Sequence, residues 1–370
     1  MKELKRGYTT GTCAAAASKA AVLAALGDDR DAVSVTLPSG RILDIPVEIR
    51  GESGRRSFCA VRKYSGDDPD ITDGILIYSY AELIPEGENR VTVWGGEGVG
   101  RVTKPGLACD PGVAAINPVP MKMIREESAK GAEEHGFRGT ILIEIAIPEG
   151  RRLAEKTFNP RLGIEGGLSI LGTSGIVEPM SEDAIRGTIK AELSGEAAAG
   201  AAYILTTPGN YGETFIKETM ELDDVYCVKC SNFVGDTIRM AKELCFRGLL
   251  FTAHIGKLSK VAAGAMNTHS KYGDMRMEAL AEAAEKAGAG EETLKAVRES
   301  VMTDGALYIL ENAGFMKKTM DILTERAAEN MREQAEDMEI AVVMFSNKYG
   351  LLAETENACA MGQKLRRKVR

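Results

Sequence analysis

The sequence is short of the residues that build several common kinds of site. Among 370 residues there are three histidines, at positions 135, 254 and 269. So few and so scattered histidines argue against a metal centre built on imidazole ligands. No apolar run approaches the roughly 20 residues of a membrane-spanning helix, and the 12 prolines follow no period that would indicate a collagen-like chain.

Positive charge and cysteine are also scarce. The chain has 46 basic and 54 acidic residues, a net charge of −8, which argues against binding to nucleic acid or to an anionic membrane. The seven cysteines are an odd number spread thinly, which favours reduced thiols and a cytoplasmic location. Cys227 and Cys230 have no second pair elsewhere, so two buried thiols are favoured over a zinc or redox site.

The common nucleotide-binding signatures are absent. The run Gly95–Gly100 does not fit G-x-G-x-x-G, because Arg101 takes the last place in the best register. No P-loop is present, since Gly256-Lys257 lacks the upstream glycine and is followed by leucine. We therefore expect no phosphate chemistry of the P-loop kind.

Glycine, by contrast, is abundant. It accounts for 40 of the 370 residues, whereas it makes up roughly 7% of an average protein. The glycines gather in Gly95–Gly112, in residues 157–181 and in short turns of the second half. Because glycine lets a backbone approach a ligand closely, these segments are predicted to be ligand-binding loops.

The order of predicted elements divides the chain into two domains. Strand-like runs with two interspersed helices predict an α+β layered domain over residues 1–194. Short apolar strands alternating with long helical stretches predict a Rossmann-like three-layer α/β domain, with a mainly parallel sheet, over residues 195–370.

Four polar, glycine-bearing loops follow predicted strands of the second domain. They are Thr206–Glu213, Cys230–Asp236, His254–Lys257 and Ser346–Gly350. The carboxyl ends of parallel strands share one sheet edge, where ligands of such folds bind. Ordinary turns use the same residue types, but their repetition at one edge favours a ligand site whose helix N-termini suit a carboxylate or phosphate.

Three charged clusters stand out in the first domain. The turn Gly66–Asp73 is acidic, and it is either a solvated turn or a site that holds a cation, orients an ammonium or sulfonium, or supplies a base. Arg101–Gly106 and Asn159–Gly163 place cations beside glycines, which fits a substrate carboxylate. Surface salt bridges are the alternative for both basic clusters.

Several long motifs occur in order along the chain. They are Gly7–Ala16, Gly98–Leu107, Ile116–Pro120, Thr157–Gly163, Ile170–Met180, Pro208–Asn210, Ser231–Asp236 and His254–Leu258. In these motifs the sequence resembles the cobalt-precorrin-5B C1-methyltransferase family (CbiD) of anaerobic cobalamin biosynthesis. The resemblance implies that S-adenosyl-L-methionine donates a methyl group to ring carbon C1 of cobalt-precorrin-5B, giving cobalt-precorrin-6A. It also implies that the cobalt is carried by the substrate and that the protein binds no metal of its own.

The resemblance also suggests a role for each group of residues. Donor-binding residues are expected at the edge of the second sheet, namely Pro208, Gly209, Asn210, Gly212, Glu213, Ser231, Asn232, Asp236, His254 and Gly256. The tetrapyrrole is expected to meet Arg101, Lys104, Asn159, Arg161 and Lys257. Asp67 and Asp70 are the catalytic candidates, to steady the sulfonium or to accept a proton.

The expected partner is a small tetrapyrrole, with no nucleic acid and no membrane. A homo-oligomer and transient hand-over to neighbouring pathway enzymes are further expectations. Two other functions stay open: a nicotinamide-dependent reductase built on the same sheet, and a tetrapyrrole carrier without enzymatic activity. The first predicts dinucleotide binding, and the second predicts tight ring binding without donor affinity.

Overall fold

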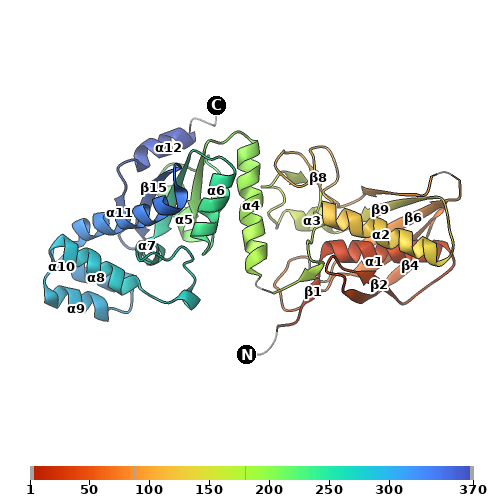
Figure 1. The fold of residues 1–370 in the computed structure, drawn as a ribbon, viewed down its shortest axis with the longest axis horizontal. Coiled ribbons are helices and arrows are strands. Elements are labelled where there is room, and N and C mark those ends of the chain that lie inside the picture. Colours follow the sequence, from red (N-terminus) through yellow and green to blue (C-terminus); the bar gives the residue numbers. More distant parts are fainter. Residues whose placement is uncertain (1–3, 87, 180, 367–370) are drawn as a thin grey trace. The chain divides into compact units, whose positions relative to one another are not determined.

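The computed structural model describes residues 4–86, 88–179 and 181–366, and it separates the chain into two compact units (Figure 1). The units are Met1–Glu182 and Asp183–Arg370. The predicted boundary between residues 194 and 195 falls inside helix α4 (Glu182–Ala198). Leu193 of this helix is buried in the core of the second unit, so α4 folds with that unit. The helix ends before Gly200, whose φ is +80°.

A five-stranded sheet with the order β4-β5-β6-β9-β7 forms the base of the first unit. Neighbouring strands are antiparallel, except that β7 and β9 are parallel. The strands are β4 (Ile49–Ser53), β5 (Arg56–Arg62), β6 (Leu76–Ile84), β7 (Arg90–Gly95) and β9 (Thr140–Ala146). Burial alternates along β6, because successive side chains of a strand point to opposite faces.

Two helices pack together against this sheet. Helix α1 (Thr10–Ala25) contacts both α2 (Pro118–Glu134) and strands β5 and β6. Half of its residues are alanines, whose small side chains permit this close approach, and every residue from Thr10 to Leu23 is buried. The helices and the mostly antiparallel sheet make the α+β layers predicted for this part of the chain.

Short two-stranded ladders also occur in the first unit, and that of β8 with β10 joins its two glycine-rich segments. The paired strands are β1 (Gly7–Tyr8) with β11 (Ile176–Val177), β8 (Arg101–Val102) with β10 (Ile164–Glu165), and β2 (Ala32–Thr36) with β3 (Ile42–Pro46). Helix α3 spans Gly150–Ala154. A Cβ atom on Gly98 or Gly167 would overlap backbone atoms of neighbouring segments. These two glycines therefore permit close backbone packing within the unit, and the ligand-binding role of their segments stays a prediction.

The second unit contains another five-stranded sheet, with the order β13-β12-β14-β15-β16. The first four strands are parallel, and β16 pairs antiparallel with β15. The strands are β12 (Tyr203–Thr207), β13 (Cys227–Lys229), β14 (Gly248–His254), β15 (Glu339–Ser346) and β16 (Gly350–Glu354). Counted along the unit, this is the order 2-1-3-4-5 of doubly wound α/β folds.

Helices cover both faces of this sheet. On one face, α5 (Asn210–Thr219) and α12 (Ala358–Arg366) share a core with the sheet. The core of the other face includes residues of α4, α6 (Val234–Glu243), α7 (Ile255–Ala262), α8 (Arg276–Ala287), α9 (Glu291–Glu299), α10 (Thr303–Asn312) and α11 (Met316–Ala335). The predicted three-layer α/β architecture with a mainly parallel sheet is confirmed. Within the described ranges, no helix is both long and apolar enough to cross a membrane.

Candidate functional site

The strand order of the second unit indicates where a ligand would bind at the edge of its sheet. Strands β12 and β14 are neighbours, but the helix after β12 packs on one face of the sheet and the helix after β14 on the other. Ligands of doubly wound folds bind in the crevice that such a divergence opens beyond the strand ends. Two predicted donor loops, Thr206–Glu213 and His254–Lys257, border this position, and all four predicted loops follow strands that end at this edge.

The loop after β12 brings α5 very close to the strand. A Cβ atom on Gly212 would overlap the Thr207 hydroxyl oxygen and would lie 2.9 Å from Thr207 Cβ, so only glycine fits. The Thr207 hydroxyl is fully buried and has no hydrogen-bond partner among the described residues. Pro208 leads into Gly209, which precedes α5 without a side-chain cap and has open space where a Cβ would stand. The backbone of this loop is therefore accessible at Gly209.

Glu213 is held by two lysines. Its carboxylate accepts from Lys229 Nζ at 2.6 Å and from Lys217 Nζ at 3.2 Å. The hydrogen bond from Lys229 is the main reason why the pKa of Glu213 is lowered. Lys229 also donates to Asn210 Oδ1 at 3.0 Å. These contacts connect the first turn of α5 to the end of β13.

The loop after β13 contains a strained backbone. Ser231 has φ +52°, and the other non-glycine residues with positive φ in the described chain lie at helix C-termini. Residues other than glycine rarely adopt this backbone conformation. The next residue, Asn232, accepts through Oδ1 from Lys257 Nζ and from Thr268 Oγ1. Burial lowers the pKa of Lys257, and the charge of Lys260 lowers it further.

Asp236, in the first turn of α6, is paired within the unit. It accepts from Arg186 Nε at 3.4 Å and from Arg239 Nη2. The Arg186 guanidinium also lies over the Phe233 ring, 4.7 Å from its centroid. Through its hydrogen bond with Arg186, the Asp236 carboxylate holds α4 against α6.

His254 ends β14 and caps α7. Its Nδ1 atom accepts from the Gly256 N–H at 3.1 Å, and its ring meets the Phe345 ring edge-on at 5.6 Å. Because Nδ1 accepts, the neutral imidazole carries its proton on Nε2. Burial lowers the pKa of His254, and the Asp304 carboxylate opposes this shift only in part. His254 is thus a neutral N–H donor at the sheet edge.

Two residues at this edge were not among those predicted. Ser346 ends β15 and donates to Asp304 Oδ1 at 3.2 Å, and it accepts from the Lys348 N–H at 3.1 Å. The loop from Ser346 had the polar composition of the others, which was a usable signal. Asp304 gave none, because α10 was not predicted from the sequence.

Cys227 and Cys230 are free thiols, the first at the start of β13 and the second just after its end. Burial raises the pKa of both, in Cys230 to about 12. Cys230 is thus a buried thiol, as the sequence favoured, whereas Cys227 is only partly buried. No group of three or more His, Cys, Asp or Glu residues in the described ranges is placed to hold a metal ion.

In the first unit, the predicted catalytic carboxylates anchor their own turn. Asp70 accepts from the buried Lys63 ammonium at 2.6 Å and from the Thr72 N–H at 2.8 Å. Burial acts to raise the pKa of Asp70, but the Lys63 and Thr72 hydrogen bonds outweigh it, and the net pKa is lowered. Asp67 accepts from the Lys5 N–H at 2.8 Å. Both carboxylates thus hold backbone or side-chain groups of the first unit, and their catalytic role stays a prediction.

The predicted ring-binding cations of this unit come from two segments that lie together. Arg101 is on β8, and Arg161 just precedes β10, the partner strand of β8. The Lys104 side chain packs over Gly163, since a Cβ there would lie 2.6 Å from Lys104 Cγ. Arg101, Lys104 and Arg161 are exposed. The fourth predicted cation, Lys257, belongs to the second unit.

Asn159 differs from these cations because it is buried. Its Nδ2 donates to the Gly167 carbonyl oxygen at 3.2 Å, and its Oδ1 accepts from Ser169 Oγ at 3.4 Å. Through these two hydrogen bonds, Asn159 stabilises the loop that carries Arg161.

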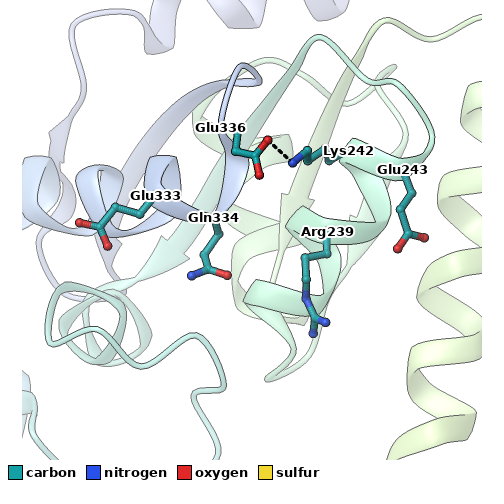
Figure 2. Close-up of a pocket in the computed structure, with 6 residues that line it drawn as sticks. All are labelled: Arg239, Lys242, Glu243, Glu333, Gln334 and Glu336. Atoms are coloured by element: carbon teal, nitrogen blue, oxygen red, sulfur yellow. Dashed lines mark ion pairs between the residues drawn. The ribbon is translucent and has the colours of Figure 1, made fainter.

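A charged hollow of about 410 Å³ lies on the second unit between α6 and α11 (Figure 2). It is lined by Arg239, Lys242, Glu243, Glu333, Gln334 and Glu336, and Lys242 pairs with Glu336. Most of its α6 residues come from the end of the helix, whereas α6 begins at the carboxyl edge of the sheet. None of the predicted site residues lines it.

Comparisons with known proteins give one family. The CbiD family model matches residues 1–179, and the model of the CbiD C-terminal domain matches residues 267–356. A relative from Thermoanaerobacter sp. is 45% identical over 359 residues, covering 95% of this chain and 96% of the relative. One from Ruminiclostridium cellulolyticum is 42% identical over 348 residues, covering 94% and 90%. Both are named cobalt-precorrin-5B C(1)-methyltransferase.

A crystal structure of a cobalamin biosynthesis protein (cbiD) from Archaeoglobus fulgidus is 27% identical, with a TM-score of 0.40. The match covers 73% of this chain and 84% of that one. From the family models and the end-to-end identity with the curated relatives, this chain belongs to the CbiD family.

Proposed function

We propose that this chain is a C-methyltransferase that methylates ring carbon C1 of cobalt-precorrin-5B, giving cobalt-precorrin-6A in anaerobic cobalamin biosynthesis. The observation that carries the proposal is identity of 42% and 45% with relatives of that name along nearly the whole chain. The methyl donor is S-adenosyl-L-methionine, and the cobalt is carried by the substrate.

The donor binds where the chain diverges after β12 and β14. The uncapped N-terminus of α5 offers backbone N–H groups, which suit a carboxylate. The open backbone at Gly209 is a further feature that fits a ligand at this place. When bound, the donor supplies an electrophilic methyl group.

The residues of these loops bind and orient the donor. His254 donates from Nε2, since its Nδ1 is occupied by the Gly256 N–H. Ser231 and Asn232 border the site from β13, with Asn232 fixed by Lys257. Gly212 keeps α5 against β12, so that Pro208–Asn210 holds its position. The task of the protein is to align the reacting atoms and to exclude water.

The tetrapyrrole is a polycarboxylate, which a chain of net charge −8 repels as a whole. Local cations must therefore bind it. Arg101, Lys104 and Arg161 are exposed on adjoining segments of the first unit, and arginine matches a carboxylate with two parallel hydrogen bonds. Lys257 supplies an ammonium in the second unit, and Asn159 braces the loop of Arg161.

Mass spectrometry of cobalt-precorrin-5B, incubated anaerobically with the protein, tests the function. With S-adenosyl-L-methionine, the tetrapyrrole should gain the mass of one methyl group. Controls omit the donor or replace it with a reduced nicotinamide dinucleotide, and neither should change the mass. An unchanged mass with the donor, or a change with the dinucleotide, would contradict the proposal.

The same account includes a cytoplasmic enzyme that hands its product to the next enzyme of the pathway. These expectations, with that of a homo-oligomer, stay predictions.

A further inference from the structure

The donor of the proposed reaction carries positive charge on its sulfonium and on its α-ammonium. Its site therefore calls for a carboxylate, a requirement that rests on the proposed function. The sequence suggested Glu213 and Asp236 at the sheet edge. Glu213 is held by two lysines and Asp236 by two arginines, so the charge of each is already balanced within the unit.

A third carboxylate at the same edge is balanced by no such partner. Asp304 lies in the first turn of α10 and is half-buried. It accepts a hydrogen bond from the Ser346 hydroxyl at 3.2 Å. Across the ranges that the structure describes, no lysine, arginine or histidine forms an ion pair with it. Its negative charge is available to a cationic ligand.

The pairing of β14 with β15 places Asp304 beside the diverging loops. His254, the last residue of β14, is opposite Phe345 in the register, and Ser346 is the next residue of β15. Asp304 is hydrogen-bonded to that serine and acts electrostatically on His254. The carboxylate therefore lies at the carboxyl edge of the sheet, one strand from the crevice.

The opposite side of β14 also supports a ligand at this edge. There, β12 ends at Thr207 and the chain enters α5 through Gly209, where a Cβ would meet open space and the helix N-terminus has no side-chain cap. Such a terminus offers backbone N–H groups to the carboxylate of the same donor. His254 lies between the strands that end at Thr207 and Ser346, and its Nε2–H is directed by the cap at Nδ1.

We propose that the Asp304 carboxylate binds a cationic group of the methyl donor. Ser346 is a positioning residue, because its hydroxyl fixes one carboxylate oxygen of Asp304. Glu213 and Asp236, in contrast, hold helices α5 and α6 in place.

Isothermal titration calorimetry of S-adenosyl-L-methionine with the full-length chain tests this assignment. Asp304→Asn keeps the shape and the hydrogen bond to Ser346 but removes the charge, and it should weaken binding about tenfold or more. The matched control is Asp321→Asn, an exposed aspartate of α11 paired with Lys317, and it should bind the donor as the unchanged protein does.

S-adenosyl-L-homocysteine, which lacks the sulfonium charge but keeps the ammonium, identifies the cation. If Asp304→Asn weakens the binding of both compounds alike, the carboxylate binds the ammonium. If it weakens only that of S-adenosyl-L-methionine, the carboxylate faces the sulfonium. Ser346→Ala should show the same pattern with a smaller loss, which an unfolded variant would not reproduce.

Two results would overturn the inference, and they are distinct. Binding of both compounds by Asp304→Asn with unchanged affinity would refute the role of Asp304 alone. Failure of the unchanged protein to bind either compound would refute the proposed donor, and the assignment of Asp304 with it.

Discussion

Gly212, in the first turn of α5, lies so close to Thr207 at the end of β12 that a Cβ atom on residue 212 would overlap the threonine hydroxyl. This contact sets the distance between helix and strand exactly where the donor loop begins to leave the sheet. The contact also means that the structure requires glycine at position 212, and the free energy of unfolding of a Gly212 variant measures that requirement.

Replacing Gly212 with alanine should destabilise the protein by about 1–3 kcal/mol, as overpacked sites do. Without the overlap, the same change within a helix would stabilise by about 1 kcal/mol, so the sign of the effect tests the geometry. Gly187 of α4 is the matched control, because a Cβ there meets nothing within 4 Å. Urea unfolding of both variants measures the difference.

A second variant isolates the contact. Thr207→Ala combined with Gly212→Ala removes the overlapping oxygen but keeps the Cβ of residue 207 at 2.9 Å, so it should recover part of the lost free energy of unfolding. Equal instability of the single and double variants would mean that this Cβ or the Thr252 carbonyl oxygen, and not the hydroxyl, opposes the new methyl group.

The buried Lys63 ammonium should depend on Asp70. Lys63 is 2% exposed and donates to the Asp70 carboxylate at 2.6 Å. Asp70→Asn leaves that charge buried without a counter-charge, which costs about 3–5 kcal/mol. Asp67→Asn is the control, because Asp67 is bonded to the exposed Lys5 N–H, and it should cost less than about 0.5 kcal/mol.

The same pair predicts a pH dependence. The pKa of Asp70 is lowered in the folded protein, whereas the pKa of an aspartate in the unfolded chain is about 3.9. Asp70 therefore stabilises the fold above that pH, and the contribution is lost as the pH falls through the folded pKa. Urea unfolding from pH 6 downwards should show this loss in the unchanged protein and a flatter profile in Asp70→Asn. A steeper profile in the variant would contradict the assignment.

Arg101→Ala should weaken binding of the tetrapyrrole and leave donor affinity unchanged. The reason is that its guanidinium is exposed in the first unit, whereas the donor loops belong to the second. Loss of one charge-assisted hydrogen bond corresponds to about tenfold in the dissociation constant of the ring. Arg41→Ala, an exposed arginine beside β3, is the control.

Fluorescence or absorbance titration measures the affinity for the tetrapyrrole, and calorimetry measures the affinity for the donor. A variant that loses donor affinity and keeps ring affinity would mean that the two sites have been exchanged.

The layers of both units could be predicted from the sequence, because buried strands and amphipathic helices alternate in recognisable runs. The four loops at the second sheet edge followed from the same alternation, since carboxyl ends of parallel strands must meet. Gly195 misled the boundary prediction. A glycine within a helix looks like a helix end in the sequence, but Leu193 ties α4 to the second core.

The partners of charged side chains could not be read in the same way. Asp236 was predicted to bind the donor, but nothing in the sequence indicated that Arg186, 50 residues earlier, hydrogen-bonds to it from α4. The ion pair of Asp70 with the buried Lys63 was likewise not visible in the sequence. Asp304 was missed because α10 follows an exposed apolar turn, with Val301 and Met302, that obscures the helical pattern.

The most direct test of the account is NMR of the product made from S-adenosyl-L-methionine with a ¹³C-labelled methyl group. The account predicts one enriched methyl group, with its carbon bonded to ring carbon C1 of the tetrapyrrole. A product enriched at another ring carbon, or a tetrapyrrole that takes up no label, would contradict it.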